Sequence, residues 1–122
     1  MGGLSGGPLR RGQIWWAWLD PVVGSEQAGR RPVVIVCADD LLVGPTVIAV
    51  PLTSTASDPM PAFKVPLAAD GAGLTRDSFA LCQQVRVLSL KRLGRLVGQV
   101  APDDMRAIDR ALLYALGLED AA

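Results

Sequence analysis

Two short apolar runs on either side of a polar segment restrict the fold of this chain more than any other feature. Residues 14–19 (I-W-W-A-W-L) and 33–38 (V-V-I-V-C-A) have the length and composition of strands. Between them, residues 24–32 read G-S-E-Q-A-G-R-R-P and supply a hydroxyl, a carboxylate, an amide and two guanidiniums. A polar loop held between two strands is a common location for binding or catalysis, although composition alone favours a solvated hairpin loop.

The two-residue period of a strand divides the first run into two faces. Trp16 and Trp18 share one face. Trp15, Ala17 and Leu19 share the other. We expect the tryptophans to pack in the core or against a second copy of the chain, and base stacking by one of them is the second choice.

The middle of the chain alternates short strand-like runs with turns that contain glycine and proline. Strands are predicted at residues 46–53, 63–67, 78–88 and 95–100, and one helical turn at residues 89–93. The register of the strands at 33–38 and 46–53 can also be predicted. If they form a simple hairpin centred near Leu42, residues whose numbers add to 84 face each other. Arg31 then lies opposite Thr53, with Cβ atoms ~5 Å apart, unless a bulge shifts the pairing.

The last element carries the clearest pattern in the chain, that of an amphipathic helix. Pro102 suits the first helical position and Gly117 suits the position after the last turn. Apolar residues at helical spacing are expected on the sheet and polar residues in solvent; the two sets are Met105, Ile108, Leu112 and Leu116, and Arg106, Asp109 and Arg110. Short strands and one terminal helix predict a mainly β fold with minor α, a partly closed antiparallel β-barrel.

Length and charge set further limits. The 122 residues suit one domain at residues 10–118, with a glycine-rich disordered tail at 1–9 and a short C-terminal tail at 119–122. Lysine plus arginine and aspartate plus glutamate number 12 each, so any affinity for nucleic acid must come from a local patch.

Residue types that are scarce narrow the chemistry. The chain has no histidine, which removes the commonest general base and metal ligand. Cys37 and Cys82 lie in apolar runs and are interpreted as small core residues of a reducing compartment, with a disulfide as the alternative. We find no metal-ligand spacing, signal peptide or run near the ~20 residues of a membrane helix, so we expect a cytoplasmic protein.

Seven motifs, in order along residues 9–118, resemble the MazF/PemK-type toxins of bacterial type II toxin–antitoxin systems. They read R-G-Q-I-W at 11–15, L-D-P at 19–21, G-S-E-Q-x-G-x-R-P at 24–32, V-P-L-T-S at 50–54, D-S-F-A-L-C-Q-Q-V-R at 77–86, L-G-R-L-V-G at 93–98 and A-L-G-L at 115–118. A set of motifs in order is far more specific than any one of them.

The resemblance implies an SH3-like β-barrel, a homodimer and an mRNA interferase that cleaves single-stranded RNA at short specific sequences without a metal or other cofactor. Attack by the 2′-hydroxyl would give a 2′,3′-cyclic phosphate and a 5′-hydroxyl. It also implies a cognate antitoxin whose acidic, disordered tail occupies the RNA groove at the dimer interface. Two alternatives stay open: a gyrase-binding toxin of the same fold, and a non-catalytic RNA-binding dimer.

The resemblance also implies the catalytic residues. Arg31 matches the family's essential arginine, and a guanidinium suits phosphate oxygens; we expect it to stabilise charge, worth ~3 kcal/mol by analogy with one oxyanion donor. Its alternative is an ion pair with Glu26. Thr53 matches a functional threonine of the family, and its alternative is an ordinary strand residue. Glu26 is the candidate base, or else it orients Arg31.

Five further residues are expected to contact RNA through hydroxyl, amide or guanidinium groups: Ser25, Gln27, Ser54, Gln84 and Arg86. A subset of the family has histidine at position 25, arginine at position 81 and aspartate at position 83. This chain has Ser25, Leu81 and Gln83 there. The acid–base scheme of that subset therefore cannot operate here, which leaves the proton acceptor open.

Overall fold

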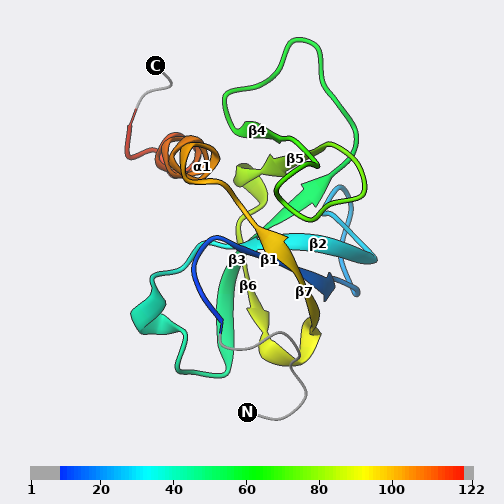
Figure 1. Ribbon diagram of the computed structural model, residues 1–122, viewed down its shortest axis with the longest axis vertical. Helices are drawn as coiled ribbons and strands as arrows, with labels where there is room; N and C mark the ends of the chain where they lie inside the picture. Colours follow the sequence, from blue (N-terminus) through cyan, green and yellow to red (C-terminus); the bar gives the residue numbers. More distant parts are fainter. Residues whose placement is uncertain (1–8, 120–122) are drawn as a thin grey trace.

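A computed structural model describes residues 9–119, so most of the predicted N-terminal tail, and residues 120–122 of the C-terminal tail, lie outside the described residues. The described part forms seven strands, three 3-10 turns and one α-helix (Figure 1). The elements are β1 (Gln13–Trp18), β2 (Arg30–Ile35), η1 (Asp39–Leu41), β3 (Thr46–Thr53), β4 (Lys64–Leu67), β5 (Ser78–Leu81), η2 (Cys82–Gln84), β6 (Arg86–Ser89), η3 (Leu90–Arg92), β7 (Leu93–Gln99) and α1 (Pro102–Ala115).

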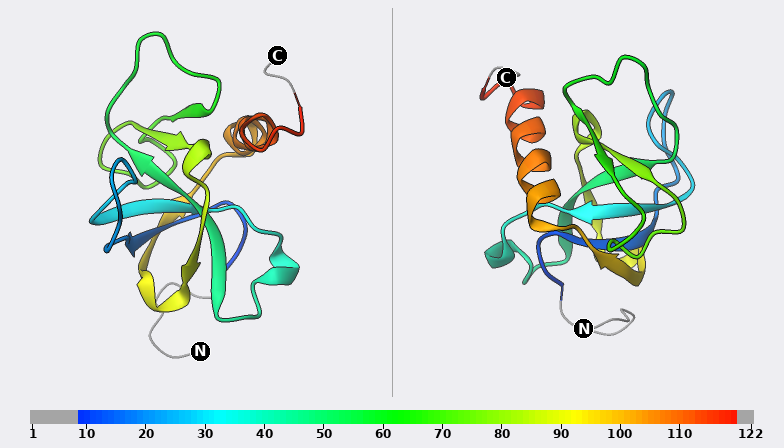
Figure 2. Two further views of the ribbon diagram at one scale, coloured as in Figure 1. Left: turned by 180° about the vertical axis from the view of Figure 1, so that it is seen from behind. Right: turned by 45° about the horizontal axis from the view of Figure 1, so that its top comes forward.

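All neighbouring strands pair antiparallel in the order β4-β5-β3-β2-β1-β7, and β6 pairs with the first half of β3. The sheet bends strongly without closing, and α1 lies beside it next to β4 and η2 (Figure 2). This confirms the prediction of a mainly β, partly closed antiparallel barrel with a C-terminal helix.

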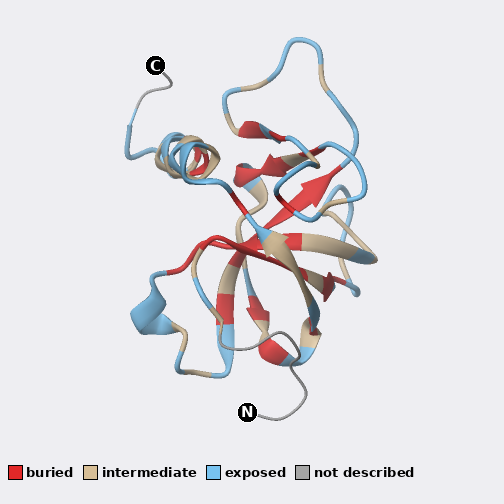
Figure 3. Cartoon of the chain, viewed as in Figure 1, coloured by how far each residue is buried: buried red, intermediate tan, exposed pale blue. Residues whose placement is uncertain are grey.

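The buried residues, red in Figure 3, form two hydrophobic clusters, and one of them includes Ile108 and Ala111 of α1. Trp15 and Ala17 of β1 are buried whereas Trp18 is 57% exposed, so the predicted division of that strand into two faces is confirmed. In α1, Ile108 is buried, with Met105 and Leu112 packed around it. The predicted apolar stripe stops there, because the helix ends before Leu116.

The register between β2 and β3 is also confirmed. The paired residues are Val33 with Pro51, Val34 with Val50, and Ile35 with Ala49. Strand β2 nevertheless begins at Arg30 and ends at Ile35, so the predicted range of 33–38 was wrong. Residues Arg30, Arg31 and Pro32 join the strand because they pair with Trp18, Ala17 and Trp16 of β1.

Two other predictions were wrong. The single strand predicted at 78–88 is two strands separated by η2. Its halves pair with β3 in registers that differ by three residues, so the three residues of η2 leave the ladder. Asp109 of the polar helix face is not simply solvated, because it accepts hydrogen bonds from the Arg11 guanidinium.

Both cysteines are buried free thiols, as interpreted from the sequence. Within residues 9–119, no helix is long and apolar enough to cross a membrane. The same residues hold no cluster of three or more His, Cys, Asp or Glu side chains that could hold a metal ion.

Candidate active site

A cavity of about 360 Å³ opens along the seam of the partly closed barrel. Part of the lining comes from the segment that precedes β5, and another part comes from β7. The middle is formed by Trp16 of β1, residues 30–32 of β2 and residues 52–54 at the end of β3. The cavity therefore lies where the two ends of the sheet approach each other.

The cavity opens here because β3 leaves β2. The β2–β3 pairing ends at Val33 and Pro51, and the next residues of β3 pair with β5 instead, Leu52 with Ala80 and Thr53 with Phe79. Proline has no N–H to donate, so Pro51 suits the point where one ladder ends. The predicted register therefore holds for the three pairs up to Val33 and Pro51, but the predicted direct pairing of Arg31 with Thr53 was wrong, because the two strands have separated at that point.

Arg31 and Thr53 line the same cavity. The Arg31 side chain is half-buried, and its Nε donates to the carbonyl oxygen of Ala28 at 2.8 Å. This bond fixes the guanidinium plane, and the other N–H groups make no hydrogen bond within residues 9–119. Thr53 is 8% exposed, and its Oγ1 accepts from the amide of Thr55 at 3.2 Å. A fixed guanidinium and a buried hydroxyl at one cavity can bind two oxygens of a phosphate.

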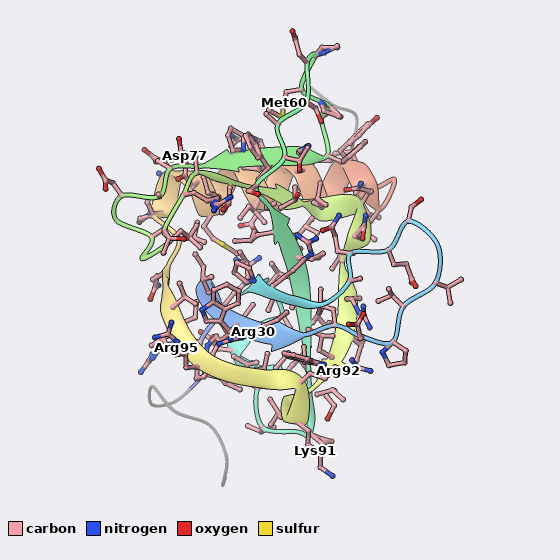
Figure 4. All side chains as sticks on the ribbon, turned by 90° about the vertical axis from the view of Figure 1, so that its right-hand side faces the viewer. Arg30, Met60, Asp77, Lys91, Arg92 and Arg95 are labelled. Atoms are coloured by element: carbon pink, nitrogen blue, oxygen red, sulfur yellow. The ribbon has the colours of Figure 1, made fainter. Side chains whose placement is uncertain are left out.

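The cavity lining carries four guanidiniums and no carboxylate: Arg30, Arg31, Arg76 and Arg95. Within residues 9–119 none of the four forms an ion pair. Figure 4 labels Arg30, the first residue of β2, and Arg95 of β7. On a chain of zero net charge, this concentration makes the cavity a local site for anions.

Glu26 is not among the residues that line the cavity. The residue is exposed, and its Oε1 accepts from the amide of Val23 at 2.6 Å, which closes the tip of the β1–β2 loop. It forms no ion pair with Arg31. The carboxylate predicted as base or orienting group therefore has a structural partner, and the structure does not bring it to the predicted catalytic pair.

Of the five predicted RNA-contacting residues, some line the cavity and others do not. Ser54 lines the cavity and is exposed. Gln84 is occupied with the β1–β2 loop: its Oε1 accepts from the Gln27 amide at 2.8 Å, and its Nε2 donates to the Ser25 carbonyl at 3.4 Å. Arg86 lies on β6, opposite Ala49, outside the cavity lining.

Arg30 and Arg76 line the cavity but were not predicted as individual site residues. Arg30 could have been predicted from the sequence, since it directly precedes Arg31 in the polar segment at residues 24–32. Arg76 lies in the loop before β5, which contacts β7, and sequence spacing does not show this contact. Gly73 and Gly98 make that contact: a Cβ on Gly98 would lie 2.0 Å from the Ala72 oxygen, and one on Gly73 would lie 2.3 Å from the Val97 oxygen.

The fold and the site define a class: small, partly closed antiparallel β-barrel proteins with an arginine-lined cavity at the seam. Residues 10–116 match the family of PemK-like, MazF-like toxins of type II toxin–antitoxin systems, and the chain belongs to this family. The resemblance stated from the motifs is thereby confirmed.

Solved structures support the assignment. One is an endoribonuclease from a mycobacterial species in complex with its cognate antitoxin, with 29% identity, a TM-score of 0.75, and coverage of 93% of this chain and 98% of that one. Another is the Mycobacterium tuberculosis toxin MazF-mt6, with 26% identity, a TM-score of 0.73, and coverage of 88% and 98%. MazF from Deinococcus radiodurans has the same fold, with 24% identity, a TM-score of 0.78, and coverage of 92% and 99%.

Proposed function

We propose that this toxin is a sequence-specific endoribonuclease that cleaves single-stranded mRNA in the cytoplasm, by attack of the 2′-hydroxyl and without a metal ion. The main observation in support of this function is that Arg31 and Thr53 line one cavity, whose lining has four guanidiniums and no carboxylate. The relatives described as endoribonucleases support the same activity.

In the proposed mechanism, the phosphate whose bond is cleaved binds between Arg31 and Thr53. The Nε bond to Ala28 holds the guanidinium plane in place, so its free N–H groups meet the charge that develops on the phosphate oxygens. Thr53 Oγ1 donates to one of those oxygens or orients the attacking group. An arginine retains its proton at working pH, so its contribution is electrostatic.

The position of Glu26 argues for a limited role in proton transfer. Its carboxylate closes the β1–β2 loop tip and lies outside the cavity lining. The proposed mechanism therefore relies on charge stabilisation and positioning, and assigns no side chain of the cavity as a strong base.

The cavity also supports a proposed partner. An antitoxin with an acidic, disordered tail would place carboxylates against the same guanidiniums and so exclude RNA. A relative was solved with its cognate antitoxin. We propose such an antitoxin for this chain, acting on a homodimer.

The test is to incubate the purified protein with a long RNA in EDTA and to map the ends of the products. Cleavage at a short recurring sequence, with 5′-hydroxyl and 2′,3′-cyclic phosphate ends, is the expected result. Loss of one phosphate-binding donor costs roughly 10²–10³ in kcat, so Arg31→Ala should be at least this impaired.

Glu26→Gln is the matched variant, because the amide keeps an Oε1 acceptor for the Val23 amide and removes only the charge. We expect kcat within about threefold of wild type, since no general-base contribution of ~10²-fold is lost. Full activity of Arg31→Ala would remove Arg31 from the mechanism. An RNA that is bound tightly and never cut would refute the endoribonuclease activity and would favour a non-catalytic RNA-binding protein.

A further inference from the structure

Trp16 and Arg30 form a stacked pair at the β1–β2 edge of the cavity. Trp16 pairs with Pro32 and Trp18 pairs with Arg30, so Trp16 and Arg30 are diagonal neighbours on one face of the two strands. The Arg30 guanidinium carbon lies 4.9 Å from the centroid of the Trp16 ring. Both residues line the cavity.

Packing of the protein itself does not account for this pair. Trp16 belongs to neither hydrophobic cluster and is half-buried, whereas its neighbour Trp15 is fully buried. Arg30 is exposed, and its guanidinium makes no hydrogen bond or ion pair within residues 9–119. The residue of β7 beside Trp16 is the exposed Gly94, which brings no side chain to cover the indole.

Such a pair is suited to a flat, electron-rich ring. Single-stranded nucleic acids stack their bases on aromatic rings and on guanidinium planes, and each such contact contributes substantially to affinity. Arg30 is also the chain neighbour of Arg31, so its Cα lies ~3.8 Å from that of the residue proposed to bind the phosphate. One nucleotide can therefore place its phosphate at Arg31 and its base at the Trp16–Arg30 pair.

We propose that Trp16 and Arg30 form the stacking site for one nucleobase of the RNA next to the cleaved phosphate. The proposal rests on the proposed function and adds to it: the ligand is an unstacked base, and the two residues hold it by its face. Because every base has such a face, the site fixes the position of the strand more than the identity of the base.

The test pairs protein variants with RNAs that each lack one base. Short labelled RNAs containing the mapped cleavage sequence are made uncleavable by a 2′-deoxy substitution at the attacking nucleotide, and single abasic positions are moved along them. With the wild-type protein, one abasic position next to the cleaved bond should raise Kd about tenfold. With Trp16→Leu, Kd for the intact RNA should rise by a similar factor, and the penalty at that one position should disappear.

Three variants sharpen the result. Trp16→Phe keeps an aromatic face and should retain most of the penalty. Arg30→Gln should weaken it, since the amide keeps a flat polar group without the charge. Trp18→Leu is the control, because Trp18 lies on the same face of β1 but does not line the cavity, and it should leave every penalty unchanged.

Folding and assembly are measured alongside, by circular dichroism and sedimentation. A folded Trp16→Leu protein that shows the same abasic penalties as wild type overturns the proposal. A Trp16→Leu protein that loses its dimer and keeps its RNA affinity also overturns it, and assigns Trp16 to packing between copies. Failure of the wild-type protein to bind the RNA at all would instead refute the proposed function, so the two failures are distinguishable.

Discussion

Replacing Gly98 by alanine should force apart the two backbone segments that meet at the seam of the barrel. The new Cβ would lie 2.0 Å from the Ala72 carbonyl oxygen and 2.7 Å from its carbon, whereas real Cβ contacts essentially never fall below 3.0 Å. The segments must therefore separate by about 1 Å. Both partners are backbone, so no side chain can rotate to relieve the contact.

The expected cost follows from overpacking, which destabilises by typically ~1–3 kcal/mol. For a domain of this size, a loss of ~2 kcal/mol lowers Tm by roughly 6–10 °C. The separation also moves the segment that carries Arg76 away from β7, and residues of both segments line the cavity. We therefore expect weaker RNA binding, seen as a higher KM, in addition to the loss of stability.

Two glycines serve as controls because each isolates one effect. Gly71 lies in the same loop with φ of 82° and open space around it, so Gly71→Ala introduces backbone strain without a clash, costing ~1–2 kcal/mol. Gly94 has neither a positive φ nor a close contact, so Gly94→Ala should leave stability unchanged. Urea unfolding and RNA cleavage are measured on all three. A Gly98→Ala protein as stable as wild type would refute the tight seam, and a destabilised one with unchanged KM would refute its role in shaping the cavity.

Two other predictions concern stability. Burial raises the pKa of the Cys82 thiol from 9.0 to about 12, and the charge of Asp109 adds to the effect. Between these two pH values the unfolded chain loses the thiol proton and the folded chain keeps it. The free energy of unfolding should therefore fall by up to ~1.4 kcal/mol for each pH unit. A Cys82→Ala protein whose free energy of unfolding, measured in urea titrations, falls with the same slope as that of wild type would contradict this. The Arg11–Asp109 ion pair is partly exposed, with side chains 32% and 42% accessible. A double-mutant cycle of Arg11→Met and Asp109→Asn should therefore give a coupling free energy of only ~0.5–1 kcal/mol, which falls in high salt. A coupling free energy that does not depend on salt would count against an ion pair.

Local patterns were sufficient for much of the fold. The predicted strand at residues 46–53 matches β3 at both ends, and the hairpin register holds for all three pairs of β2 and β3. The alternation of β1 correctly placed Trp15 and Trp18 on different faces, although the expected core packing of the tryptophans holds for Trp15 and not for Trp18, which is 57% exposed. These features depend only on a few neighbouring residues or on a single turn. The two-residue period of a strand, or the number of residues in the turn, is therefore enough to predict them.

The site depends on contacts between segments that are far apart in the chain, and the hydrophobic period of a single strand or helix does not predict such contacts. Gln84 resembles a ligand-binding amide in the sequence, yet the structure uses it to hold residues 25 and 27 of a loop far along the chain. Glu26 lies close to Arg31 in sequence, but the loop folds so that its carboxylate caps Val23 instead. Arg76 reaches the cavity through the glycine contact with β7. The family resemblance predicted Arg31 and Thr53 as a catalytic pair, and tertiary contacts decide which side chains line the cavity beside them.

The split between β2 and β3 explains how one cavity can use consecutive residues of both strands. Adjacent residues of a strand point to opposite faces, so a cavity on one face could be lined by Arg30 or Arg31, but not by both. Both line it, and so do Thr53 and Ser54 at the end of β3. The cavity must therefore pass through the edge of the sheet, where the pairing ends at Val33 and Pro51. A polynucleotide bound there would meet guanidiniums from both faces of β2, which gives the phosphate and the neighbouring base separate partners from two successive residues.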